Sequence, residues 1–342
     1  MGDMQGREVD LDATNIAHGG ISVARLDGRG VFVSDAIPGE RIRARITDDS
    51  KAAFWRADTV AVLDPSPHRR PHPWPEASVE RDPSERAGGA EFGHIDPAHQ
   101  RALKAQVLRE ALARFAHVER HAEVEALPGP EDGTGWRTRM RLHVSPTGVL
   151  GPYAARSHTV VPVRSLPLAV PELQEIAPLA ERFEPSTGDV DLLAPSVGGP
   201  RMIVGRQARS VIRERVGDRE FLVDDAGFWQ VHRHAAETLT RAVTDAVDES
   251  RFDPKAANLD LYGGVGLLAA AVGDRFGSAT RITSVESDAR ATEHAAENLA
   301  DWVGAKAVTA RVEHWVRDLS AASAAERARQ RGATVVLDPP RS

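Results

Sequence analysis

The 342-residue sequence contains no cysteine. Disulfides, thiolate metal sites and a cysteine nucleophile are therefore excluded within these residues. The sequence also has no run of about 18 uncharged apolar residues, so we expect no membrane span. Its first residues lack the apolar core of a signal peptide. We therefore expect a cytoplasmic, monomeric protein that does not associate with a membrane.

The composition that is present is that of a globular protein, with 41% hydrophobic residues, 27% charged residues and a net charge of -7. The length suggests two or three domains. Joints rich in proline and glycine favour three, with boundaries at 1–63, 64–225 and 226–342. The net charge neither supports nor excludes a nucleic-acid partner, because such binding depends on local patches.

Two segments alternate arginine with apolar or small residues. The first belongs to residues 8–63, where short strand patterns and turn signals recur about every ten residues and predict a small all-β barrel. Alternation places all the arginines of a strand on one face, which suits contact with RNA phosphates. A solvated outer face is the alternative. The arginines are Arg41, Arg43 and Arg45 in the first segment, and Arg137, Arg139 and Arg141 in the second.

The middle of the chain is expected to form an α+β region. Residues 64–96 are rich in proline, glycine and charge, which indicates a linker or an irregular loop. Asp96 and Pro97 predict the start of a helix. Apolar residues at helical spacing between Leu103 and Phe115 predict a buried stripe on that helix.

From Gly227 onward, predicted strands alternate with predicted helices. The first predicted helix covers residues 228–247, and the alternation that follows predicts a parallel sheet of Rossmann-like type. Asp260 ends an apolar strand, and glycines follow at 263, 264 and 266. Glycine there allows a ligand to approach the backbone closely, next to the N-terminus of a helix.

The glycine turn fits two cofactors. Glu286 ends the following predicted strand, where a carboxylate can bind both hydroxyls of a ribose. Gly264, Gly266 and Ala269 also satisfy the dinucleotide fingerprint, so NAD competes with S-adenosylmethionine (SAM). SAM needs an acid near its ammonium group, and we expect Asp260 to provide it. A turn that serves only packing is the third reading.

The last strand pattern opens onto Asp338-Pro339-Pro340. In open α/β sheets, ligands bind at the carboxyl ends of strands. Two prolines fix their own φ angles and hold Asp338 in extended geometry. We therefore expect a stiff shelf beside the cofactor, on which a planar base can rest.

In that order, the motifs resemble those of the RNA uracil-C5 methyltransferases, which make 5-methyluridine in bacterial tRNA and 23S rRNA. The motifs are Phe228–His232, Asp260–Gly266, Val285–Glu286 and Asp338–Arg341, and residues 17–33 resemble the family's TRAM domain, an RNA-binding β-barrel. The resemblance implies a SAM-dependent methyltransferase domain and an RNA partner, tRNA or rRNA. The residues it implies for SAM binding are Gln230, Tyr262, Gly264, Gly266, Glu286 and Asp338, with a weaker match at Glu313.

Two departures from the family bear on chemistry. Members with an iron-sulfur cluster carry cysteines where this chain has Ala87 and Ala90, so we expect no cluster. Uracil C5 is a poor nucleophile, and the family activates it by adding a cysteine thiolate to C6 before a base removes the C5 proton. Both groups lie beyond the Asp338–Arg341 motif in the family, so we expect the counterparts of both beyond Ser342. The expectation is a C-terminally truncated methyltransferase domain, inactive alone, with no catalytic residue within the chain.

Other functions remain open from the sequence. An exocyclic-amine methylase also uses an acid-proline-proline motif, although an aromatic residue normally follows it, where this chain has Arg341. A non-catalytic RNA-binding protein and an NAD-binding oxidoreductase are the remaining alternatives.

Overall fold

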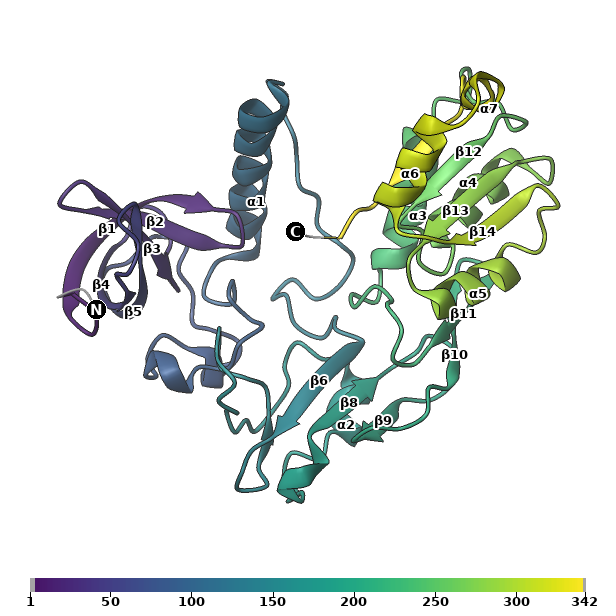
Figure 1. Cartoon of the computed structure of the whole chain (residues 1–342). Coiled ribbons are helices and arrows are strands. Elements are labelled where there is room, and N and C mark those ends of the chain that lie inside the picture. Colours follow the sequence, from purple (N-terminus) through teal and green to yellow (C-terminus); the bar gives the residue numbers. More distant parts are fainter. Residues whose placement is uncertain (1–3, 341–342) are drawn as a thin grey trace. The chain divides into compact units, whose positions relative to one another are not determined.

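The computed structural model describes residues 4–340, which fold into two compact units (Figure 1). The first unit comprises the residues up to Leu192 together with Met202–Arg206. The second comprises Leu193–Arg201 and the residues from Gln207 onward. Residues 207–225 thus fold with the C-terminal part of the chain. The division at 1–63, 64–225 and 226–342 stays a prediction.

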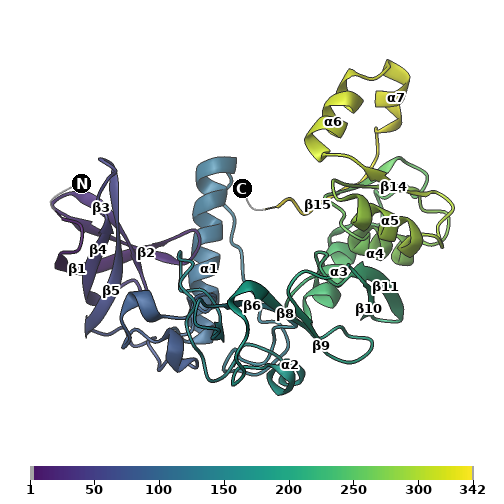
Figure 2. The same cartoon turned by 60° about the horizontal axis from the view of Figure 1, so that its bottom comes forward.

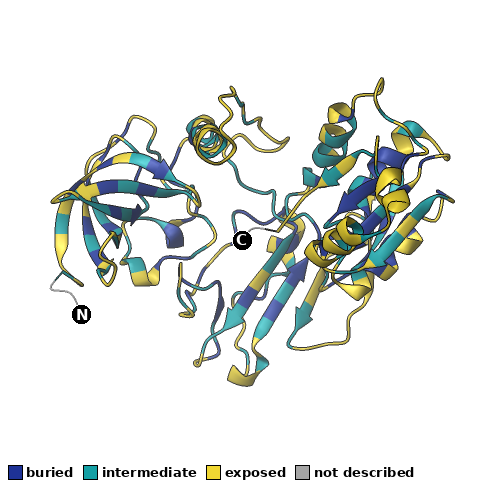
Figure 3. Cartoon of the chain, turned by 45° about the horizontal axis from the view of Figure 1, so that its top comes forward, coloured by how far each residue is buried: buried dark blue, intermediate teal, exposed yellow. Residues whose placement is uncertain are grey.

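A closed five-stranded barrel occupies the start of the first unit, as the sequence predicts. The strand order is β1-β2-β3-β5-β4, in which β3 and β5 pair in parallel and the other pairs are antiparallel. Alternate residues point inward and form the barrel core (Figure 3). The strands are β1 (Glu8–Ala17), β2 (Ile21–Leu26), β3 (Arg29–Ser34), β4 (Arg41–Asp48) and β5 (Phe54–Asp64).

The segment between β5 and the first helix is irregular, as expected, but it is packed against the rest of the unit. It contains the single turns η1 (Pro75–Ala77) and η2 (Pro83–Glu85). Trp74 is 1% exposed and Arg86 is 4% exposed. The Arg86 guanidinium donates to the backbone oxygens of residues 59, 79 and 81 and to a carboxylate oxygen of Asp35. These bonds fasten the loop to the barrel.

Helix α1 (Pro97–Ala111) begins where predicted, since Asp96 Oδ1 accepts hydrogen bonds from the backbone N–H groups of residues 98 and 99. The predicted buried stripe is confirmed only in part, at Leu103 and at Val107, which packs against the same core cluster. Leu103 is buried against the barrel side, but Leu108 is 42% exposed and Phe115 is 76% exposed. Only one turn of the helix meets the barrel. The π-helical turn η3 (Leu112–Ala116) then shifts the phase of the later residues.

A second sheet completes the first unit, with strand order β7-β6-β8-β9. Strand β6 begins at Arg139, so Arg137 lies outside it and forms an isolated parallel bridge with Ala169. The remaining elements here are β6 (Arg139–Val144), β7 (Leu150–Gly151), α2 (Pro171–Ile176), η4 (Pro185–Thr187), β8 (Asp189–Leu193) and β9 (Arg201–Val204).

The second unit contains a β-hairpin and the predicted parallel sheet (Figure 2). All pairs of the sheet are parallel, in the order β14-β13-β12-β15. Helix α5 packs on β11, β13 and β14, and α4 packs on α3, β12 and β13. The elements are β10 (Val211–Val216), β11 (Arg219–Asp224), α3 (Ala235–Ala246), β12 (Asn258–Leu261), α4 (Leu267–Phe276), β13 (Ile282–Glu286), α5 (Ala289–Asn298), β14 (Ala305–Thr309), α6 (Val312–Ala321), α7 (Ala324–Arg329) and β15 (Val335–Leu337).

The predicted helix at 228–247 is wrong over its first turns, because α3 begins only at Ala235. Trp229 is buried against Phe221 of the hairpin, with ring centroids 5.8 Å apart. The His232 ring accepts a hydrogen bond from the backbone N–H of His234 and closes a turn there. Residues 228–234 therefore form an irregular segment. Among residues 4–340, no helix has the length and apolar character needed to cross a bilayer.

Candidate functional site

The turn after β12 contains three glycines at positions where a residue with a side chain would clash or be strained. Gly263 has no room for a side chain, because a Cβ there would lie 2.0 Å from Ser284 Oγ and 2.7 Å from Asp260 Oδ2. Gly264 and Gly266 have φ angles of 55° and 88°, in the left-handed region that favours glycine. Gly266 is the N-cap of α4, so the turn leads directly into the start of that helix.

Glu286 ends β13 beside this turn. Its Oε2 accepts a hydrogen bond from the backbone N–H of Gly264 at 3.1 Å. Its Oε1 accepts from the backbone N–H groups of Ser287 and Asp288, at 2.5 and 2.9 Å. Oε1 also accepts a hydrogen bond from Ser287 Oγ at 2.9 Å. These bonds fix the carboxylate and leave acceptor capacity on Oε2, which has a second lone pair for a hydroxyl group of a ligand.

Asp260 lies beneath the glycine turn and is 1% exposed. Its Oδ2 accepts hydrogen bonds from the N–H of Ala269 at 3.2 Å and from Ser284 Oγ at 3.4 Å. These contacts make Asp260 a support of the turn, and its expected role beside a ligand ammonium stays a prediction. Burial raises the pKa of Asp260 to about 7, with smaller contributions from the charges of Asp338 and Glu286.

Tyr262 connects the turn to helix α6. Its backbone has a φ of 64°, unusual for a residue with a side chain. Its hydroxyl donates a hydrogen bond to Glu313 Oε1 at 3.0 Å, which raises the pKa of Tyr262. The pKa of Glu313 is lowered, first by a hydrogen bond from its own backbone N–H and then by the Tyr262 hydroxyl. Glu313, the weaker match to the family motifs, is thus hydrogen-bonded to Tyr262, one of the stronger matches.

Asp338 follows β15, next to the central strand β12, and its side chain is exposed. Its charge and that of Glu286 both act on Asp260. Three carboxyl groups, on or directly after three neighbouring strands, therefore lie at one edge of the parallel sheet. An edge of this kind favours a cationic ligand.

The end of the predicted motif lies outside the described residues, which stop at Pro340. Arg341, the last residue of that motif, and Ser342 lie outside the described residues. The expectation that a nucleophilic cysteine and a general base follow Ser342 concerns residues beyond this sequence, and it stays a prediction.

Gln230 lies on the irregular segment between β11 and α3 and is half-buried. Within residues 4–340, no hydrogen bond joins its side chain to Tyr262, Glu286 or Asp338. Strand pairing and the contacts above therefore place the five other predicted cofactor residues at one edge of the sheet, and the role of Gln230 stays a prediction. Ser284 was missed by the sequence reading, because a serine inside an apolar strand carries no signal of its own.

The arginines of β4 project from the barrel, as their alternation predicts. Each pairs with an acidic side chain of β1, and Arg45 pairs also with Asp82, which lies in the segment between β5 and α1. Arg43 Nε is 2.8 Å from Asp10 Oδ1, and Arg41 is 3.8 Å from the same carboxylate. Arg45 pairs with Glu8 at 3.2 Å and with Asp82 at 2.9 Å. The cationic face is therefore balanced by negative charge in the folded barrel.

The second group of arginines is more varied. Arg141, on β6, pairs with Asp191 of β8 at 2.7 Å. Arg139 shares that strand and is half-buried. Arg137 is half-buried before β6, and its Nε donates to the backbone oxygen of Arg139 at 3.0 Å. Burial lowers the pKa of Arg137, opposed by the nearby charge of Glu91. Within residues 4–340, no group of three or more His, Asp or Glu side chains is arranged to hold a metal ion.

The parallel sheet, its glycine turn and the carboxylate on the next strand are features of α/β proteins that bind a nucleotide-like cofactor at the carboxyl edge of the sheet. No protein-family model matches the chain. An uncharacterized RNA methyltransferase from Streptomyces avermitilis is 33% identical over 86% of this chain and 76% of its own length. Another from Bifidobacterium longum is 30% identical over 98% of this chain and 82% of its own length. The chain belongs to this family of RNA methyltransferases, which confirms the resemblance drawn from its motifs.

One solved structure shares the fold over most of the chain. It is the tRNA (uracil-54, C5)-methyltransferase of Pyrococcus abyssi in complex with S-adenosyl-L-homocysteine. The TM-score is 0.60 at 18% sequence identity, and the match covers 88% of this chain and 79% of that chain. Both units of the present chain are thus of a known methyltransferase architecture.

Proposed function

We propose that the chain binds SAM at the carboxyl edge of its parallel sheet and belongs to an enzyme that methylates C5 of uridine in tRNA or rRNA. The observation that carries the cofactor proposal is the position of Glu286 and Asp338, each at the carboxyl end of a strand that pairs with β12. SAM bears an ammonium and a sulfonium group, both cationic. NAD bears two phosphates, which the carboxylates of Glu286 and Asp338 would repel.

The residues present fit SAM in their chemistry. Glu286 is held by backbone N–H groups and retains acceptor capacity on Oε2 for a ribose hydroxyl. Gly264 has no atom within 4 Å of the position of a Cβ, so the turn leaves open space beside it. Tyr262 and Glu313 join the turn to α6 and present a polar, partly anionic wall. When bound, SAM would supply an electrophilic methyl group.

The choice of uracil C5 rests on the family motifs, with support from the shared fold of the archaeal tRNA uracil methyltransferase. Methylation at that carbon requires a nucleophile that adds to C6. The 342 residues contain no cysteine. We infer that these residues supply cofactor and RNA binding, and that by themselves they do not turn over uridine.

The cofactor proposal is tested by calorimetric titration of the chain with SAM, S-adenosylhomocysteine and NAD in parallel. We expect both adenosyl compounds to bind and NAD not to bind. NAD binding as tight as that of SAM would contradict the proposal.

The proposal that uracil C5 is the methylated atom is tested on RNA from cells that lack the gene for this protein. We expect one 5-methyluridine to disappear from tRNA or rRNA. Loss of a methylated exocyclic amine, with 5-methyluridine unchanged, would favour the amine methylase instead.

A further inference from the structure

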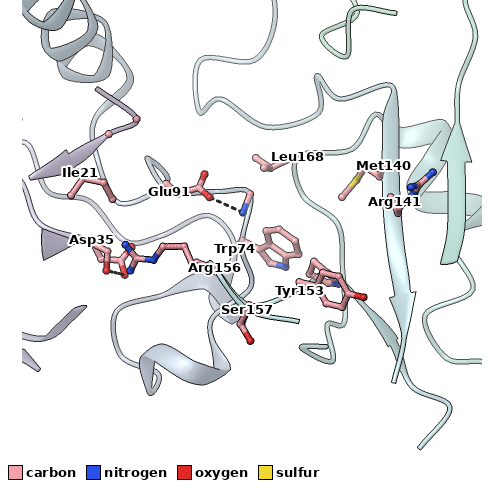
Figure 4. Close-up of a pocket in the computed structure, with 18 of the residues that line it drawn as sticks. Ile21, Asp35, Trp74, Glu91, Met140, Arg141, Tyr153, Arg156, Ser157 and Leu168 are labelled. Atoms are coloured by element: carbon pink, nitrogen blue, oxygen red, sulfur yellow. Dashed lines mark hydrogen bonds between the residues drawn. The ribbon is translucent and has the colours of Figure 1, made fainter. Parts of the chain in front are cut away.

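A cavity of about 580 Å³ is lined by residues of the first unit (Figure 4). Its walls come from loops of the barrel, from the packed segment before α1, from β6 and from residues 152–157. Its volume falls within the range of roughly 300–1,000 Å³ that is typical of small-ligand sites. Neither the cofactor proposal nor the arginines of β4 use this cavity.

The charged side chains that line the cavity are mostly arginines. Arg156 pairs with Asp58, and Arg141 pairs with Asp191. Arg137 differs from both, because no carboxylate within residues 4–340 lies within 4 Å of its guanidinium. Glu91 is the nearest opposing charge that acts on it. A half-buried guanidinium without an ion-pair partner is a costly arrangement that an anionic ligand would relieve.

Two aromatic side chains, Tyr153 and Trp74, also line the cavity and form one wall of it. Tyr153 stacks on His143, with ring centroids 3.5 Å apart and planes inclined by 2°. The backbone oxygen of Tyr153 accepts a hydrogen bond from Gly88 N–H at 2.9 Å, and a Cβ on Gly88 would lie 2.9 Å from that oxygen. Trp74 also lines the cavity and is 1% exposed. The wall is therefore held by packing and by the backbone.

The backbone beside this wall is unusual as well. Arg156 has a φ of 57°, one of few left-handed residues with a side chain in the described chain. Such conformations cost free energy and cluster at ligand sites. The ion pair with Asp58 holds the Arg156 guanidinium in place despite that cost.

We propose that this cavity binds one nucleotide of single-stranded RNA, with its phosphate on Arg137 and its base against Tyr153. The proposal rests on the proposed function, which makes RNA the partner. A cation and an aromatic ring on one cavity match the phosphate and the base of a nucleotide. Unstacked RNA bases bind to aromatic rings and arginine planes in this way.

The test is the binding of a fluorescein-labelled oligouridine, followed by anisotropy over a series of salt concentrations. For Arg137→Gln, we expect the salt slope to fall by about 0.7 and the affinity to fall roughly fivefold near 0.1 M salt, as for one lost phosphate contact. Arg137→Lys should keep most of the slope. Arg241→Gln, which removes the same charge from the exposed side of α3, is the matched control and should change neither quantity.

The base contact is tested separately at Tyr153. Tyr153→Leu should weaken binding roughly tenfold with an unchanged salt slope, because stacking is lost and no phosphate contact is removed. Tyr153→Phe keeps the ring and should bind like the wild type. Cooperative thermal unfolding of each variant verifies that it is folded.

S-adenosylhomocysteine titrations of the same proteins separate the two proposals. Wild-type chain that does not bind oligouridine overturns the nucleotide cavity, as do Arg137→Gln and Tyr153→Leu variants that bind as tightly as the wild type. Wild-type chain that does not bind S-adenosylhomocysteine overturns the cofactor proposal, and the oligouridine results still decide the cavity.

Discussion

The backbone N–H of Gly264 donates a hydrogen bond to Oε2 of Glu286, with 3.1 Å between the nitrogen and the oxygen. This bond joins the turn after β12 to the end of β13, two positions 22 residues apart in the sequence. It sets the direction of the carboxylate that we assign to the ribose of SAM. The glycine turn therefore helps to position the carboxylate that we assign to the ribose.

Glu286→Gln should weaken S-adenosylhomocysteine binding by about 10- to 100-fold, since a hydrogen bond to a charged group contributes roughly 1.5–3 kcal/mol. The amide keeps one acceptor oxygen but loses the charge. Glu293→Gln, on the exposed side of α5, is the control and should bind like the wild type. Equal affinities for the two variants, measured by calorimetry, would contradict the assignment of Glu286.

Gly263→Ala should destabilise the second unit by about 1–3 kcal/mol, because the added Cβ meets Ser284 and Asp260 in a closed space. Gly199→Ala is the control, since a Cβ at Gly199 has no neighbour within 4 Å. The free energy of unfolding in urea is the measurement. A Gly263→Ala variant as stable as the Gly199→Ala variant would show that the turn has room that this structure lacks.

The buried carboxyl of Asp260 should make stability depend on pH. Its pKa is raised from 3.8 to about 7, so between these values the folded chain keeps a proton that the unfolded chain has released. Stability contributed by this group therefore falls as pH rises through that window. Asparagine does not ionise. The stability of Asp260→Asn relative to wild type should increase by a few kcal/mol, at most about 4, between pH 4 and pH 7.

The matched control for this pH dependence is Asp318→Asn, which changes an exposed carboxylate on α6. Unfolding free energies are measured over the same series of pH values. A constant difference between Asp260→Asn and wild type would mean that Asp260 is already ionised in the folded chain.

Because acidic side chains pair with the β4 arginines, removal of one acid is expected to tighten the binding of RNA. Asp10→Asn removes the carboxylate that pairs with Arg41 and Arg43. If this face contacts RNA, the affinity for tRNA should rise several-fold and the salt slope should steepen by about 0.7–0.9 for each phosphate gained. Asp12→Asn removes a charge from the same strand and should have a smaller effect, because no arginine lies within 4 Å of that carboxylate among the described residues. An unchanged tRNA affinity in Asp10→Asn would exclude the face as a contact surface.

Incubation of the 342-residue chain with SAM and tRNA or rRNA should yield no 5-methyluridine, because no thiolate is present to add to C6 of uracil. Nucleoside mass spectrometry of the digested RNA is the measurement. Binding of S-adenosylhomocysteine by the same preparation shows that the cofactor site is intact. Formation of 5-methyluridine would refute a mechanism that depends on cysteine.

The features that the sequence predicted are those set by short-range patterns. The barrel strands, the start of α1 at Pro97 and the turn at Gly264 each depend on neighbouring residues. The start of α3 at Ala235 was missed, because Trp229 packs on Phe221 of the hairpin, and the helical pattern of the sequence does not reveal this tertiary contact. The buried stripe on α1 was only partly right, because burial depends on which turn of the helix the barrel reaches.

The site was predictable to a similar degree. Glu286 follows from its place after a strand, but its hydrogen bond to Gly264 depends on the register of β12 and β13. The pairing of Arg43 with Asp10 is likewise a matter of strand register. The cavity that contains Arg137 and Tyr153 is assembled from segments far apart in the sequence, so no local pattern could indicate it.

The central claim is tested most directly by a crystal structure of the chain with S-adenosylhomocysteine. We expect the ribose hydroxyls to lie within hydrogen-bond distance of the Glu286 carboxylate, with the amino acid part beside the turn at Gly264. Density for the ligand at another place on the chain, or an empty sheet edge at saturating ligand, would contradict the claim.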